Sequence, residues 1–169
     1  LIPFTNQAIE RDARDIGNEF YSVIKEHLMI TKVKVLGEVE LDSTFCACQF
    51  IETSQIEKAN GMMKYYSLLT SFINEYNLDV DGPPSVRIVD WSHRQGQLKF
   101  DFCFTIIPTD SLPMVKEITY KRFKKQKALK AEYRGNYITS DRAWYELIQY
   151  AKENGYETTG MPIEYFHDN

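Results

Sequence analysis

The chain has 169 residues, of which 43% are hydrophobic and 26% are charged, and it carries a formal net charge of −4. This length is enough for one domain, or for two packed halves, with a sizeable core. The negative net charge argues against a general nucleic-acid-binding surface, and no apolar stretch is long enough to form a transmembrane helix.

The first half of the chain is predicted to form one helix and then several strands around a second helix. Residues 6–28 have apolar side chains at helical spacing, and Asn6 is the candidate N-cap of this helix. This helix either acts as a connector, together with the rest of residues 1–30, or packs on the outside of the sheet. The further elements expected are strands at 32–35, 45–51, 86–91 and 98–106, a bend at Gly37, a long helix at 54–76 and a hairpin around 93–96.

The second half is predicted to repeat this order after a linker at 108–113. The elements expected are strands at 114–122, 128–133 and 163–167, and a helix that Ser140 or Asp141 caps and that ends at Asn154, with Gly155 in the C′ position. The basic run at 121–127 overlaps the end of one strand. We interpret this run as a solvated strand end or hairpin rather than as a phosphate- or membrane-binding patch.

The two halves are alike at a constant spacing of 78 residues. This spacing relates Gly82 to Gly160, Pro84 to Pro162 and Asp90 to Asp168. We therefore predict a duplicated unit, with repeat one at 31–107 and repeat two at 114–169. The counterpart of the strand at 98–106 would begin near residue 176, so the closing strand of repeat two is expected to be missing. A sheet without it would expose an unpaired edge, unless a partner segment covers that edge.

The cysteines and histidines show no pattern of a metal or catalytic site. Cys46, Cys48 and Cys103 are an odd number of thiols in predicted strands. We expect buried free thiols in a reducing compartment, rather than a disulfide framework or metal ligands. No catalytic triad or phosphate-binding glycine loop is present, so no catalytic residue, metal or cofactor is assigned.

Repeat two resembles the GyrI-like small-molecule-binding domain, the effector module of bacterial multidrug-sensing transcription activators and of gyrase-inhibitory proteins. The residues that carry the resemblance are 133–137, 143–147, 153–157 and 160–168. Repeat one resembles the first half of that domain at 82–84 and 98–103. The resemblance covers residues 31–169. It implies an α+β fold of two pseudo-symmetric βαββ units, in which an antiparallel sheet with flanking helices forms a cleft between the halves.

The resemblance also implies a function, which is the binding of small aromatic or cationic molecules in this cleft by a sensing or sequestering module. Two alternatives remain open, namely a cofactor-free hydrolase of reactive xenobiotics in the same cleft and a protein-interaction module of the gyrase-inhibitor type. We expect a cytoplasmic location and no direct nucleic-acid binding by this segment. Because the sequence begins with Leu1 and not with Met, we expect a fragment or processed form, from which an upstream domain or membrane anchor has been lost.

Glu164 is the residue that the resemblance singles out, because it matches the acidic position on the strand after Gly-x-Pro in the family. The equivalent residue of repeat one is Val86. In a cleft lined by aromatic rings, this carboxylate would complement a cationic ligand, and a solvated glutamate is the alternative. The remaining candidate ligand-binding residues are Tyr165, Trp144, Tyr145, Tyr66, Trp91, Tyr133 and Asp101. The helix aromatics would otherwise be core residues, and Asp101 an outward, solvated acid.

Overall fold

The computed structural model describes residues 14–23, 25, 31–92 and 96–166. The strands are β1 (Lys32–Leu41), β2 (Thr44–Ser54), β3 (Ser85–Ser92), β4 (Gln97–Thr105), β5 (Thr119–Phe123), β6 (Gln126–Arg134) and β7 (Ile163–Tyr165). The helices are α2 (Lys58–Glu75) and α3 (Asp141–Glu153), and a 3₁₀ turn, η1 (Tyr137–Thr139), precedes α3. Residues 14–23 are also helical, and their side chains are exposed. The α+β class predicted from the sequence is confirmed.

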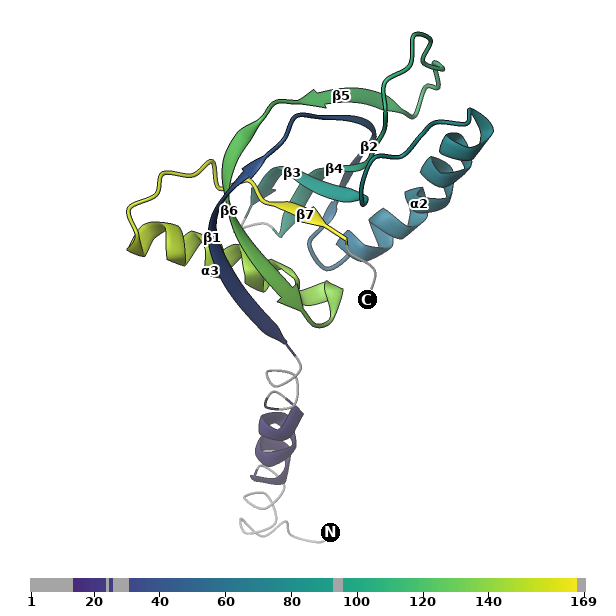
Figure 1. Ribbon diagram of the computed structural model, residues 1–169. Coiled ribbons are helices and arrows are strands. Elements are labelled where there is room, and N and C mark those ends of the chain that lie inside the picture. Colours follow the sequence, from purple (N-terminus) through teal and green to yellow (C-terminus); the bar gives the residue numbers. More distant parts are fainter. Residues whose placement is uncertain (1–13, 24, 26–30, 93–95, 167–169) are drawn as a thin grey trace, which may run out of the picture.

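The first two strands and the fifth and sixth form one continuous antiparallel ribbon that bends sharply (Figure 1). Leu41 lies opposite Gln126 before the bend, and Thr44 lies opposite Phe123 after it, so the register is unchanged across it. A bulge between Val35 and Gly37, where φ of Gly37 is +89°, adds further curvature in the region where the sequence predicts a bend.

Helix α2 covers one face of a five-stranded sheet with the order β5-β2-β4-β3-β7. The alternation in β4 predicts this face correctly, since Phe100, Phe102 and Phe104 pack in the core with Leu69 and Phe72 of α2. Gly61 permits the close approach of α2 to β2, because a β-carbon there would lie 3.2 Å from the Ile51 side chain. The opposite face, which we call the distal face, carries the side chains of Thr44, Cys46, Cys48, Ser85, Arg87, Asp101, Cys103, Thr105, Lys121, Phe123 and Tyr165.

The register of β3 and β7 brings together residues that the repeat spacing relates. Val86 lies opposite Glu164, and these two residues are 78 positions apart. Helices α2 and α3 end at Glu75 and Glu153, which have the same spacing. A local two-fold axis between β3 and β7 would produce this pairing.

Some predicted boundaries are wrong for local reasons. The strand expected from residue 114 begins only at Thr119, because the amide of Ile118 donates to the carbonyl of Val115 and closes a turn. Helix α2 begins at Lys58 rather than at residue 54, since Ser54 still pairs with Gln97 in the sheet. Parts of the helix expected at 6–28, the hairpin around 93–96 and the end of the strand at 163–167 lie outside the described residues.

The cysteines correct the expectation of free thiols. Cys48 and Cys103 lie directly opposite each other on β2 and β4 and form a disulfide, with a Cα–Cα distance of 4.1 Å. Cys46 is the buried free thiol, and its Sγ lies 3.6 Å from Oγ1 of Thr105. The register of β2 and β4 determines which two cysteines pair, and the number of cysteines in the sequence does not predict this pairing.

The disulfide predicts how many thiol groups of the protein react before and after reduction. In denaturant without reductant, the oxidised protein should show one reactive thiol, that of Cys46, and reduction should raise the number to three. Because the bond joins residues 55 positions apart, replacing Cys48 and Cys103 together by alanine should lower the unfolding free energy by about 4 kcal/mol in the chain-entropy model. Urea titration measures this loss. The control Cys46→Ala retains the bond and shows no thiol, and three thiols before reduction would contradict the pairing.

Candidate functional site

Glu164 lies at the centre of a polar cluster at the N-terminal ends of α2 and α3. Its Oε1 accepts hydrogen bonds from Lys58 Nζ at 2.9 Å, Ser140 Oγ at 2.7 Å and Trp144 Nε1 at 3.0 Å. Its Oε2 accepts one from Tyr137 Oη at 2.8 Å. The Glu164 side chain is only 11% exposed, so the alternative of a solvated glutamate is wrong.

The positive partner of this carboxylate is the side-chain ammonium of Lys58, which is 2% exposed. The Lys58 Nζ atom also donates to Ser140 Oγ at 2.7 Å and lies 4.5 Å from the ring centres of both Tyr137 and Trp144. The ammonium is therefore enclosed by a carboxylate, a hydroxyl group and two aromatic faces. This set of groups recognises organic ammonium ions in proteins.

The local structure explains why these side chains meet. Ser140 is the N-cap residue of α3, and its side chain binds Glu164 and Lys58 instead of capping the helix. The turn η1, which Asn136 caps, carries Tyr137 to the same point. Helix N-terminal ends carry partial positive charge, which favours a carboxylate there and disfavours Lys58 in the first turn of α2. Lys58 therefore depends on Glu164 for its stability in this position.

An aromatic cluster continues from Glu164 toward the surface. The ring of Trp91 packs edge-on to Trp144 at 5.0 Å and lies 5.6 Å from the ring of Tyr145. Trp144 is buried, Trp91 is half-buried and Tyr145 is exposed. Three flat apolar side chains thus connect the buried ion pair with solvent.

The structure separates the other candidate residues from this cluster. Tyr66 packs on Phe102 and Phe104 on the α2 side of the sheet. The hydroxyl of Tyr133 donates to the Asn136 carbonyl at 2.7 Å and so belongs to the turn before α3. Asp101 and Tyr165 lie on the distal face. Because neighbouring residues of a strand point to opposite faces, Tyr165 is directed away from the site of Glu164.

Asp101 is not the solvated acid that the sequence favours. It is buried, and both of its carboxylate oxygens bind Lys121 Nζ at 2.7 Å. The sequence also predicts no part in a site for Lys58, Tyr137 or Arg87, and it predicts Ser140 only as a candidate helix cap. An arginine as the only charge between Pro84 and Asp90 is the signal that could have identified one of them.

Within the described ranges, no group of three or more His, Cys, Asp or Glu residues is placed to hold a metal ion. No helix of the same residues is long and apolar enough to cross a membrane.

Comparison with known proteins identifies the family of this chain and solved structures of similar fold. The model of the GyrI-like small molecule binding domain matches residues 50–169. The crystal structure of the EcmrR C-terminal domain is similar with a TM-score of 0.67 and 14% identity, over 83% of this chain and 86% of that one. A cryo-EM structure of the EcmrR–DNA complex in EcmrR-RPo has a TM-score of 0.67 and 16% identity, over 96% of this chain and 62% of that one. No curated protein matches.

The hydroxyl of Tyr137 gives the cluster a measurable pH dependence. Burial first, and then the charge and hydrogen bond of Glu164, raise the pKa of Tyr137 above its ordinary value of 10.0. The protonated tyrosine is therefore favoured by folding. Its stabilising effect is complete below pH 10 and is lost as the pH rises further, since the unfolded chain ionises there and the folded chain does not.

We predict that the cost of Tyr137→Phe in unfolding free energy is constant from about pH 7 to 9 and shrinks by up to about 1.4 kcal/mol per pH unit above pH 10. Urea unfolding of both proteins at each pH measures this difference, and the part below pH 9 serves as the internal control. A cost that does not change up to pH 11 would show that Tyr137 ionises equally in both states.

Proposed function

The chain belongs to the family of GyrI-like small molecule binding domains, and from this premise we propose that it binds small aromatic molecules at the cluster of Trp91, Trp144 and Tyr145 beside Glu164. In this role it acts as a sensing or sequestering module. The aromatic faces supply an apolar contact surface, and the buried carboxylate supplies the fixed charge that orients a ligand.

One observation carries this proposal, namely that the Glu164 carboxylate holds an ammonium between two aromatic rings. In this chain the ammonium belongs to Lys58. The site therefore has the chemistry that recognises an organic cation, while an internal cation occupies it. A ligand cation has to compete with Lys58, whereas a neutral aromatic ligand can use the Trp91 and Tyr145 faces without displacing it.

The competition with Lys58 is costly for a ligand. Separating one partner from a buried ion pair costs about 3–5 kcal/mol, which corresponds to a loss of roughly two to four powers of ten in affinity. We therefore expect the native chain to favour neutral aromatic molecules over cationic ones of the same shape at this cluster. The hydrolytic alternative gains no support, since donors engage both oxygens of Glu164.

Calorimetric titration with a matched pair of ligands tests the proposal. We suggest benzyltrimethylammonium and its neutral carbon isostere. Lys58→Met removes the internal cation and should raise the affinity for the ammonium compound at least about tenfold, because the compound then becomes the counter-ion of Glu164. The affinity for the neutral compound should change little, and adding Glu164→Gln to Lys58→Met should abolish the gain.

The matched control is Lys64→Met, which removes an exposed lysine from the same helix and should leave both affinities unchanged. If no compound in a broad aromatic panel binds the wild-type chain, the proposed function fails. If compounds bind but Lys58→Met does not alter the preference for charge, binding occurs at another place and the assignment to the Glu164 cluster fails.

A further inference from the structure

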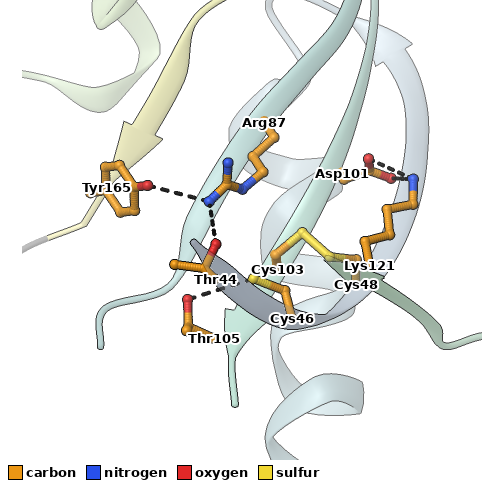
Figure 2. Close-up of a disulfide and its surroundings, with 9 residues drawn as sticks. All are labelled: Thr44, Cys46, Cys48, Arg87, Asp101, Cys103, Thr105, Lys121 and Tyr165. Carbon is orange, nitrogen blue, oxygen red and sulfur yellow. Dashed lines mark hydrogen bonds and ion pairs between the residues drawn. A yellow bond between two sulfur atoms is a disulfide. The ribbon is translucent and has the colours of Figure 1, made fainter. Parts of the chain in front are cut away.

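The distal face carries a second buried charge, the guanidinium of Arg87 on β3 (Figure 2). Arg87 is 6% exposed. Its hydrogen bonds run from Nη2 alone, to Thr44 Oγ1 at 3.2 Å and to Tyr165 Oη at 3.3 Å. Nε is buried and has no partner. Both acceptors are neutral, so the positive charge of Arg87 is not compensated by them.

The obvious counter-ion for Arg87 is already engaged. Asp101 lies directly opposite Arg87 in the β3–β4 register, and oppositely charged residues in such positions usually pair. Instead, both oxygens of Asp101 bind Lys121. No carboxylate of the described residues lies within 4.0 Å of the Arg87 nitrogens. Arg87, Lys121 and Asp101 together therefore leave one positive charge on this face.

An uncompensated buried arginine is costly, because arginine does not lose its proton in proteins and cannot become neutral. A second unpartnered polar atom lies on the same face of the same strand. Ser85 is fully buried, and its Oγ makes no hydrogen bond. Two buried donor atoms on the same face of β3, Nε of Arg87 and Oγ of Ser85, therefore have no acceptor. Buried donors are normally satisfied, so their arrangement points to an acceptor that is not part of the described chain.

The groups packed on Arg87 are partly exposed side chains that do not occupy all of its donors. The ring of Phe123 lies 3.8 Å from the guanidinium carbon and covers the flat face of the group, which leaves the N–H groups at its edge available. Thr44, Phe123 and Tyr165, which contact the guanidinium, are all half-buried, so only partly exposed side chains separate it from solvent. The buried disulfide of Cys48 and Cys103 packs with Phe123 on the same face.

We propose that Arg87 is the anchor of a second small-molecule subsite, which binds an oxyanion, and specifically a carboxylate on a small aromatic body. The edge of a guanidinium matches the two oxygens of a carboxylate, and Phe123 and Tyr165 supply ring surfaces for the aromatic part. The Tyr165 hydroxyl can donate to the same anion. The subsite lies on the face of β3 and β7 opposite to Glu164, and it does not depend on the function proposed above.

The test compares benzoate and phenylphosphonate with their neutral counterpart benzamide, by titration calorimetry on the whole chain. We expect benzoate to bind about tenfold or more tightly than the amide, because charge-assisted hydrogen bonds are about twice as strong as neutral ones. Tighter binding of phenylphosphonate than of benzoate would overturn the assignment to a carboxylate. Equal binding of the anions and the amide, or no binding of any of them, would overturn the proposal.

Arg87→Met separates a ligand-binding role from a structural one. It should abolish the preference for the anion and leave the melting temperature equal or higher, because it replaces an uncompensated charge by an apolar side chain of similar length. A large fall in melting temperature with the preference intact would overturn the proposal. The control is Arg122→Met, at an exposed position on β5, which should change neither property.

A measurement on the wild-type chain keeps the proposal testable if Arg87→Met does not fold. The NMR signal of the Arg87 Nε–H group should shift on addition of benzoate and not of benzamide, and an unchanged signal would overturn the proposal. Lys58→Met and Glu164→Gln should leave anion binding unaltered. Loss of anion binding in these variants would place the anion at the Glu164 cluster and overturn the separate subsite.

Discussion

The continuous antiparallel ribbon of β1–β2 and β6–β5 determines where every other element of this fold can lie. The register of the ribbon does not change across the bend. The bend directs the two parts of the ribbon toward different surroundings. The part formed by β2 and β5 belongs to the sheet that α2 covers, and the part formed by β1 and β6 contacts α3. Among the described residues, no helix covers the distal face of the five-stranded sheet (Figure 1). Ser85, Arg87 and Asp101 are buried on this face.

The buried charges on the two faces of β3 and β7 differ in whether an opposite charge compensates them. On one face, Glu164 and Lys58 neutralise each other, and hydroxyl and indole donors satisfy the remaining acceptor positions. On the other face, the charge of Arg87 has only neutral acceptors. Adjacent positions on one short strand, Glu164 and Tyr165, therefore belong to chemically distinct sites. In the two proposed sites, a cationic ligand would compete with Lys58 on one face, and an anionic ligand would pair with Arg87 on the other.

The sequence predicts well what depends on local pattern. Alternation in β4 identifies the face that packs on α2, and Gly155 ends α3 with φ at +71°. The duplicated unit stays a prediction, with which the pairing of Val86 and Glu164, 78 positions apart, agrees. The features that the sequence does not predict depend on which strands become neighbours. The disulfide needs the β2–β4 register, and the burial of Lys58 needs a partner 106 residues away. A lysine at the start of a helix otherwise looks like an ordinary solvated side chain.

The long separation between Lys58 and Glu164 also bears on the order in which a nascent chain can acquire this structure. When the ribosome has completed α2, the counter-charge of its first residue has not yet been synthesised, since Glu164 follows 106 residues later. Until then the partial positive charge at the beginning of α2 repels Lys58, and water has to solvate the ammonium. Burial of the Lys58 ammonium therefore becomes favourable only when β7 docks against β3. A strand of three residues, Ile163–Tyr165, thus supplies the counter-charge for a helix made much earlier in translation.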